Sequence, residues 1–179
     1  VDDIGGFFAD PLGYVMFAFP WGERGTELEE ESGPDAWQVE LLQRVGSRVL
    51  GDPTAVIKEA VASGHGVGKS ALLCWIILWV MSTRPNCRIT VTANTETQLN
   101  TRTWAELSKW HKLAINGGTF EWTATAFRHK RSPETGFATA TPWSEIRPEA
   151  IAGQHARYSV VIFDEASAIP EIIWDNAEG

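Results

Sequence analysis

The segment that constrains the fold most strongly is the glycine-rich octapeptide SGHGVGKS at residues 63–70. Its three glycines allow backbone conformations that other residues rarely adopt, so successive N–H groups can converge on one anion. The wholly apolar run Ala71–Met81 follows and predicts a buried helix, whose N-terminal partial positive charge would face the same anion. The pattern predicts a phosphate-binding loop between a strand and a helix.

Each part of this loop has an expected role in holding a nucleoside triphosphate. Lys69 would reach the β- and γ-phosphates, and the Ser70 hydroxyl would bind Mg²⁺. The strict pattern has glycine at the first position, where this chain has Ser63, but serine is small enough for the turn. The alternative is a loop that only caps a buried helix. The residues assigned to nucleotide binding are Ser63, Gly64, His65, Gly66, Val67, Gly68, Lys69 and Ser70.

An acidic pair, Asp164-Glu165, follows the apolar strand-like run Ser159–Phe163. After a parallel strand, such a pair would lie at the edge of the sheet where the phosphate loop also lies. Asp164 would hold Mg²⁺ and Glu165 would polarise the attacking water, although a plain helix cap explains the pair alone equally well. Together the two motifs predict a Mg²⁺-dependent ATPase with Lys69 and Glu165 as catalytic residues, Ser70 and Asp164 as metal ligands, and ATP and Mg²⁺ as cofactors.

Strand and helix signals alternate along the chain and predict an α/β fold of the P-loop NTPase class. We expect a mainly parallel central sheet flanked by helices, with an irregular N-terminal arm and a β-hairpin insertion. The arm would span residues 1–33 and the ATPase core residues 34–179. The expected strands are Tyr14–Phe19, Ile57–Ala62, Cys87–Ala93 and Ser159–Phe163, with hairpin strands Glu121–Phe127 and Gly136–Thr141. The expected helices begin after Asp35, at the Gly-Lys-Ser and at Thr95, where Gln98 completes a capping box.

Charge and cysteine content limit the classes of partner. The formal net charge is −8, and the densest basic cluster, Arg128–Arg131, is better explained as a solvated turn than as a nucleic-acid face. Cys74 and Cys87 form no metal or disulfide pattern. The apolar run of 11 residues is too short for a membrane span, which needs about 20. We expect no membrane association.

Trp37-Gln38 is a weaker candidate for contacting the base of a nucleotide. A glutamine amide can pair with adenine through its donor and its acceptor, and the neighbouring ring could stack on the base. The alternative is an amphipathic helix with Trp37 in the core and Gln38 facing solvent, and the residues alone favour that alternative.

Several segments together resemble the ATPase domain of tailed-phage or prophage terminase large subunits. These are DPLGYVMFAFPWG (10–22), GPDAWQ, SGHGVGKS, TANTETQ (92–98) and EAIAGQHARYSVVIFDEASAIP. The resemblance implies an ATP-driven motor that packages double-stranded DNA into capsids in the host cytoplasm. Its implied partners are a portal, a small terminase subunit and further copies of itself in a ring. It also implies an adenine contact by Gln38 beside Trp37.

The sequence departs from that family at two places. The loop has His65 where some terminases have an activating arginine, so Arg102, Arg147, Arg157 or a neighbouring subunit would supply the charge. The chain also stops at Gly179, before the family's nuclease domain, so we expect no nuclease activity. A helicase- or translocase-like P-loop ATPase, or a non-catalytic nucleotide-binding remnant, are the alternative functions.

Overall fold

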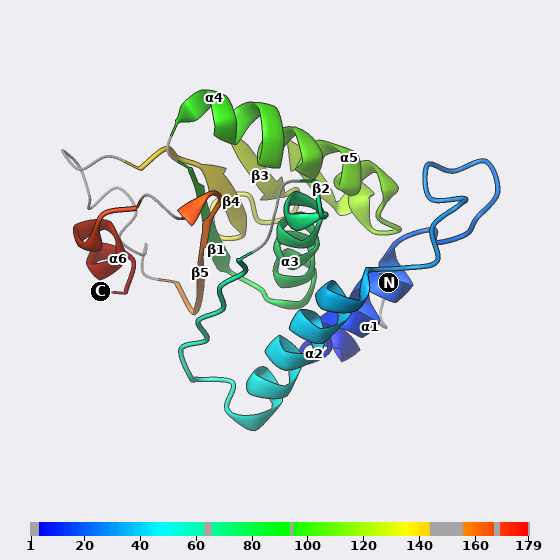
Figure 1. Cartoon of the computed structure of the whole chain (residues 1–179), viewed down its shortest axis with the longest axis horizontal. Coiled ribbons are helices and arrows are strands. Elements are labelled where there is room, and N and C mark those ends of the chain that lie inside the picture. Colours follow the sequence, from blue (N-terminus) through cyan, green and yellow to red (C-terminus); the bar gives the residue numbers. More distant parts are fainter. Residues whose placement is uncertain (1–3, 63–65, 94, 144–155, 167–168, 179) are drawn as a thin grey trace.

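The computed structural model describes residues 4–62, 66–93, 95–143, 156–166 and 169–178. It has an α/β architecture, with a five-stranded sheet in the order β2-β3-β4-β1-β5 and helices packed beside it (Figure 1). Strand β1 pairs in parallel with β4 and β5, whereas β2–β3 and β3–β4 are antiparallel. The strands are β1 Cys87–Thr92, β2 Phe120–Trp122, β3 Ala126–His129, β4 Phe137–Ala140 and β5 Tyr158–Phe163.

One buried helix, α3, lies at the centre of the molecule, with the sheet and α5 on one side and α1 and α2 on the other (Figure 1). A continuous helical stretch formed by α4, a π-helical turn and α5 crosses above it. The helices are α1 Pro11–Ala18, α2 Ala36–Gly51, α3 Lys69–Thr83, α4 Glu96–Leu99, α5 Ala105–Leu113 and α6 Glu171–Glu178. The π-helical turn is Asn100–Trp104, and the 3₁₀ turns are Ile4–Phe7 and Gly117–Thr119.

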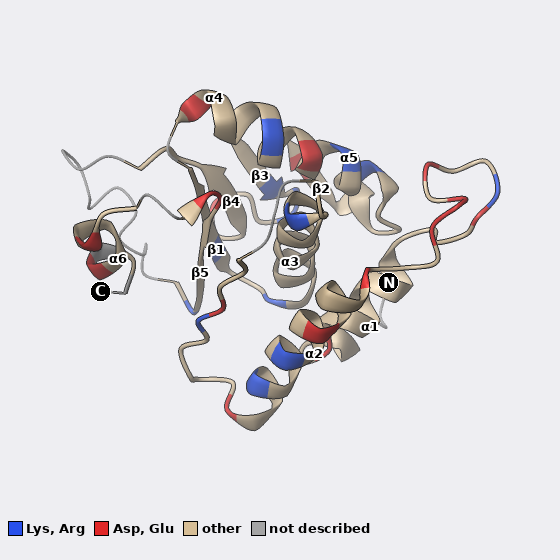
Figure 2. Cartoon of the chain, viewed as in Figure 1, with Lys and Arg blue, Asp and Glu red and all other residues tan. Residues whose placement is uncertain are grey.

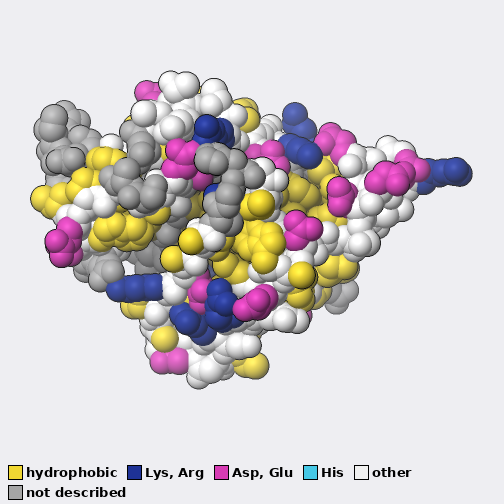
Figure 3. All heavy atoms as spheres, viewed as in Figure 1, with side chains coloured by type: hydrophobic (Ala, Val, Ile, Leu, Met, Phe, Trp, Pro, Cys, Tyr) yellow, Lys and Arg dark blue, Asp and Glu magenta, His cyan; other side chains and the backbone are white. Residues whose placement is uncertain are grey.

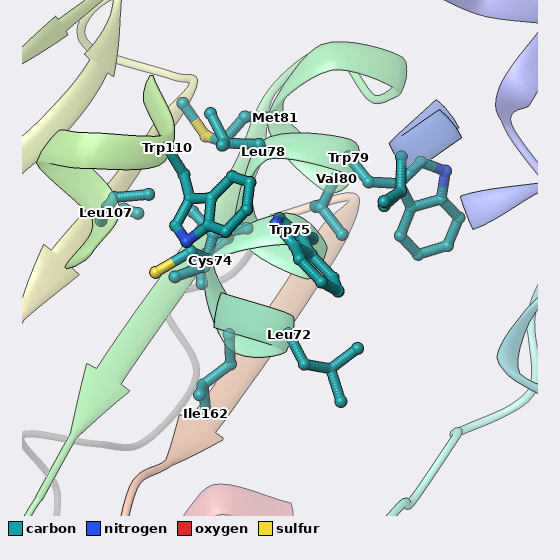
Figure 4. Packing of buried hydrophobic residues seen from close by; sticks show 14 of the residues in the cluster. Leu72, Cys74, Trp75, Leu78, Trp79, Val80, Met81, Leu107, Trp110 and Ile162 are labelled. Atoms are coloured by element: carbon teal, nitrogen blue, oxygen red, sulfur yellow. The ribbon is translucent and has the colours of Figure 1, made fainter. Parts of the chain in front are cut away.

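Helix α3 is apolar on all its faces, which suits a helix that is surrounded by α1, α5 and the sheet. Leu72, Ile77 and Leu78 are at most 2% exposed, and Figure 4 shows Leu78 on the side of α3 near Trp110 of α5. The ring of Trp75 contacts that of Trp110 edge to face, with centroids 5.0 Å apart. The buried helix predicted after the phosphate loop is confirmed. In the part of the chain that the structure describes, no helix has both the length and the apolar character needed to cross a bilayer.

The irregular N-terminal arm and its strand at Tyr14–Phe19 are wrong. Pro11–Ala18 is a helix, begun by Asp10, whose carboxylate accepts the Gly13 N–H at 2.8 Å. Tyr14 and Ala18, four residues apart, share one face of this helix and are buried against α3, where the Tyr14 hydroxyl meets Ser82 Oγ at 2.9 Å. The aromatic and β-branched content favoured a strand, but the Asp-Pro start and the helical spacing prevail.

The sheet is mixed, so the prediction of a mainly parallel sheet is wrong. The hairpin predicted around the basic loop is confirmed, because β3 and β4 pair antiparallel on either side of residues 130–136. The expected strand 121–127 is divided by a tight turn, in which Thr123 and Ala126 exchange backbone and side-chain hydrogen bonds. Because β4 pairs directly with β1, the hairpin strands extend the main sheet. Residues 57–62 form no strand. Strand β5 pairs only with β1 among the described residues, which leaves it less buried than its apolar sequence indicated.

Other boundaries agree with the sequence. Helix α2 ends at Gly51, α3 ends just before Arg84-Pro85, and β1 lies within the expected range. Helix α4 begins at Thr95, whose hydroxyl accepts the Gln98 N–H at 3.2 Å.

Tyr14 generates a prediction about alkaline stability. Burial raises the pKa of Tyr14 to about 12, against the weaker opposing effect of the hydrogen bonds that its hydroxyl makes with Ser82 and Asn116. Between pH 10 and 12 the unfolded chain therefore loses this proton before the folded chain does, so the native state loses stability as the pH rises. We expect Tyr14→Phe to be less stable by about 1 kcal/mol at pH 7.

That difference should shrink steadily above pH 10, because phenylalanine has no proton to lose. Urea unfolding of both proteins at pH 7, 9, 10 and 11 measures it. A penalty that stays constant over this range would contradict the role given to Tyr14.

Candidate functional site

The phosphate-loop candidate ends at Gly68, which caps α3 in a left-handed conformation with φ of +80°. A Cβ at this position would lie 2.7 Å from Gln38 Nε2, so two independent constraints require glycine. Gln38 Nε2 donates to the Gly68 carbonyl oxygen at 2.9 Å, and Gln38 Oε1 accepts the Asp35 N–H at 2.7 Å. One buried amide therefore joins the start of α2 to the start of α3.

The hydrogen bonds of Gln38 show that it does not face solvent. The alternative, in which Gln38 is a solvent-facing residue of an amphipathic helix, is therefore wrong. Gln38 is only 3% exposed, and both its amide oxygen and its nitrogen have protein partners. Its nitrogen has a second hydrogen available for another acceptor. Trp37 is partly buried against the core. Contact of Trp37 and Gln38 with a base stays a prediction.

Asp164 lies directly after β5, at the carboxyl end of the parallel pair β1–β5. Its N–H bonds to the Thr92 carbonyl oxygen at 2.9 Å, and Figure 2 marks the acidic segment after β5 in red. Its carboxylate is 7% exposed. The Thr103 hydroxyl donates to Asp164 Oδ2, so this buried charge has a hydrogen-bond partner.

Glu165 has a backbone φ of +58°, which is uncommon for a residue with a side chain. A left-handed residue other than glycine costs roughly 1 to 2 kcal/mol, and such residues concentrate at functional sites. Arg102 Nη1 donates to Glu165 Oε1, and the two side chains are 50% and 32% exposed. Neighbouring residues of one turn, Arg102 and Thr103, therefore contact neighbouring acids.

The π-helical turn Asn100–Trp104 produces this arrangement, and we call it the π turn. A π turn widens the helix and changes the direction in which its side chains point. Two carbonyl oxygens of the π turn have partners outside the helix. The Cys74 thiol lies 3.6 Å from the Thr103 carbonyl oxygen, and Trp122 Nε1 donates to the Trp104 carbonyl oxygen at 3.2 Å. Helix α3 and strand β2 thus both hold the π turn in place.

The same contacts connect the acids to the helix that follows the phosphate loop. Cys74 is four residues after Ser70, so the two lie on one face of α3. Cys74 is fully buried, and burial raises the pKa of its thiol well above the usual value, with a further increase from the carboxylates of Glu106 and Asp164. Through Cys74, the face of α3 that contains Ser70 is therefore turned toward the π turn whose Thr103 holds Asp164.

The donors on this face suit a hard cation. A hydroxyl from Ser70 and a carboxylate from Asp164 are oxygen ligands, which Mg²⁺ prefers. Asp164 Oδ1 accepts no hydrogen bond from the described residues. These residues also contain no group of three or more His, Cys, Asp and Glu side chains placed to bind a metal. A magnesium ion would therefore take its remaining ligands from water and phosphate.

The remaining candidates are placed differently. Ser63, Gly64, His65 and Arg147 lie outside the described residues. Arg157 precedes β5, at the opposite end of the strand from Asp164 and roughly 20 Å away at the rise of an extended chain. Among the described arginine candidates, only Arg102 contacts the acids. The sequence did not identify Thr103 as a site residue. Helical periodicity predicts that Thr103 lies in a helix, but it does not reveal the π turn that brings its hydroxyl to Asp164.

A separate hollow of about 230 Å³ lies where the end of α5 approaches the loop before β2. Its lining includes His111, Lys112 and Lys130, and the described lining residues include no acid. The Lys130 ammonium donates to the Gly118 carbonyl oxygen at 2.9 Å.

Comparison with known proteins decides the family. Residues 60–176 match the helicase domain of the RNA cytidine acetyltransferase NAT10/TcmA, which covers about two thirds of the chain. No curated protein matches the chain.

This match overturns the terminase assignment and everything that depended on it. The packaging of double-stranded DNA, the portal and small-subunit partners and the phage or prophage context are all wrong for this chain. The error has a physical reason, since a glycine-rich loop and an acidic pair after a strand serve triphosphate chemistry in many ATPases. The chain belongs to the family of the RNA cytidine acetyltransferase NAT10/TcmA, within its helicase domain.

Proposed function

We propose that this chain is an ATP-hydrolysing P-loop module of helicase type that acts on RNA. The observation that carries the proposal is the π turn, which presents Thr103 to Asp164 and Arg102 to Glu165 beside the Ser70 face of α3. A purely structural helix cap would need neither a buried carboxylate nor a strained glutamate.

The proposed mechanism assigns one task to each residue. The backbone amides before α3 and the Lys69 ammonium bind the phosphates of ATP. Ser70 and Asp164 would hold Mg²⁺, which would neutralise charge on the phosphates. Thr103 fixes the Asp164 carboxylate through its hydrogen bond. Glu165 accepts a hydrogen bond from the attacking water and aligns it with the γ-phosphate.

The division of the chain into an N-terminal segment, residues 1–33, and an ATPase core, residues 34–179, is also part of the proposal. The described N-terminal segment packs on α3, and Trp79 Nε1 donates to the Phe7 carbonyl oxygen at 2.7 Å. The segment would therefore stabilise the ATPase core.

A nucleotide-binding module without turnover is the second candidate function. The pairing of Glu165 with Arg102 favours it, because that carboxylate oxygen is already occupied.

RNA is the proposed partner because the family is named for an enzyme that acts on RNA. On the face shown in Figure 3, basic side chains lie in small groups mixed with acidic ones and form no continuous stripe. The hollow lined by Lys112 and Lys130 is a better candidate for a phosphate of the RNA backbone, since its described lining has no acid.

The first prediction concerns nucleotide binding. Lys69→Ala should weaken the affinity for ATP by at least tenfold, because a hydrogen bond from a charged group contributes about 1.5–3 kcal/mol. Isothermal titration with ATP and Mg²⁺ measures it, and Lys58→Ala, which removes the same charge before the loop, is the control. Equal affinities for wild type and Lys69→Ala would contradict the assignment of the loop.

The second prediction separates binding from turnover. Glu165→Gln should retain nucleotide binding and slow phosphate release roughly 10²- to 10⁴-fold, the usual contribution of a positioned base. Single-turnover hydrolysis with saturating ATP measures it. Wild-type rates in this variant would remove Glu165 from the mechanism, and binding without turnover by the wild type, even with RNA, would favour the second candidate function.

The third prediction tests the RNA surface. Lys112→Ala and Lys130→Ala should each weaken binding to a single-stranded RNA oligonucleotide and each lower the slope of log K against log salt by about 0.7. Fluorescence anisotropy between 50 and 200 mM salt measures both. Arg24→Ala is the matched control, because Arg24 is 97% exposed and does not line the hollow. An effect of Arg24→Ala equal to those of the lysine variants would show that only net charge matters.

A further inference from the structure

We propose that Arg102 senses the γ-phosphate, by exchanging its partner Glu165 for the triphosphate when ATP binds. This inference rests on the proposed ATPase function. Without nucleotide, Arg102 occupies a Glu165 carboxylate oxygen and the site is inactive. With ATP, the guanidinium moves to the γ-phosphate and leaves Glu165 free to orient water. The exchange moves hydrogen bonds only and breaks no covalent bond.

The two halves of the π turn differ in how firmly they are held. Thr103 is fully buried, its hydroxyl meets Asp164 and its carbonyl oxygen meets the thiol of Cys74. The Arg102 side chain is half exposed, and its ion-pair partner among the described residues is the partly exposed Glu165. The backbone of the turn is thus anchored at Thr103, while the Arg102 side chain can change partner without disturbing the core.

The position of the turn makes the γ-phosphate a reachable partner. Thr103, adjacent to Arg102, touches both the second turn of α3 and the carboxylate proposed to hold the metal. Ser70 and Asp164 would hold the metal that neutralises charge on the phosphates. Arg102 is adjacent to Thr103 and contacts Glu165, the residue after Asp164, so its guanidinium would be within reach of a triphosphate bound at the start of α3.

The chemistry favours the exchange only when the terminal phosphate is present. A guanidinium binds phosphate through two parallel hydrogen bonds, and a γ-phosphate carries more charge than the carboxylate it would replace. ADP has no γ-phosphate, so Arg102 would stay with Glu165. The device would make binding of ATP, but not of ADP, depend on Arg102.

Titration calorimetry with Mg²⁺ and either ADP or a non-hydrolysable ATP analogue tests the proposal. Arg102→Ala should weaken binding of the analogue about 10- to 100-fold, the loss expected for a charge-assisted hydrogen bond. ADP affinity should change less than about twofold. Arg157→Ala, which removes the same charge at the far end of β5, should change neither affinity.

Glu165→Gln gives a second test, in which the affinity for the analogue should not fall as it does in Arg102→Ala. Because Glu165 competes with the γ-phosphate for Arg102, this variant should bind the analogue at least as tightly as wild type does. A purely structural ion pair predicts instead that Arg102→Ala and Glu165→Gln weaken analogue and ADP binding equally, and that result would overturn the proposal.

Failure of this inference can be distinguished from failure of the proposed function. If wild type binds neither the analogue nor ADP, the ATPase function itself is wrong. If wild type binds both, Lys69→Ala weakens both, and Arg102→Ala leaves their affinity ratio unchanged, then only the sensing role of Arg102 is wrong.

Discussion

The buried carboxylate of Asp164 is the constraint on which the arrangement of the site depends. A charge that is 7% exposed is costly unless it is hydrogen-bonded, and the Thr103 hydroxyl supplies that bond. To reach Asp164, the π turn must lie against the end of β5, and the contacts of Thr103 with α3 and of Trp104 with β2 follow from that position. The π turn, the end of β5, α3 and β2 therefore pack together around one acidic residue.

The parts of the fold that could be predicted are those with a strong local signal. Helix α3 follows from a glycine-rich loop and a continuous apolar run, and β1 follows from its β-branched residues. Helix α1 was harder to predict, because its apolar residues also fit a strand, and its Asp-Pro start and the packing of Tyr14 and Ala18 on α3 decide for the helix. The mixed sheet depends on a turn at Thr123, which pattern alone does not reveal.

The acids and the loop could be selected as candidates from the sequence, since both are short motifs with a direct chemical reason, and their roles stay predictions. The contacts of the acids could not be predicted. Arg102 was one of three arginine candidates, and only the fold shows that it contacts Glu165. Thr103 gave no signal, because a lone threonine within a helical stretch forms no motif, and its contact with Asp164 depends on the π turn that only the fold reveals. The partner was the least predictable property, because loops and acidic pairs of this kind serve motors on DNA and on RNA alike.

We propose above all that the loop before α3 and the acids after β5 enclose a single triphosphate site. A crystal structure of the chain with Mg²⁺ and a non-hydrolysable ATP analogue tests this most directly. We expect the phosphates at the N-terminus of α3, the metal between Ser70 and Asp164, and the Arg102 guanidinium on the γ-phosphate. Nucleotide bound elsewhere, or phosphates without contact to either Lys69 or Asp164, would contradict the account.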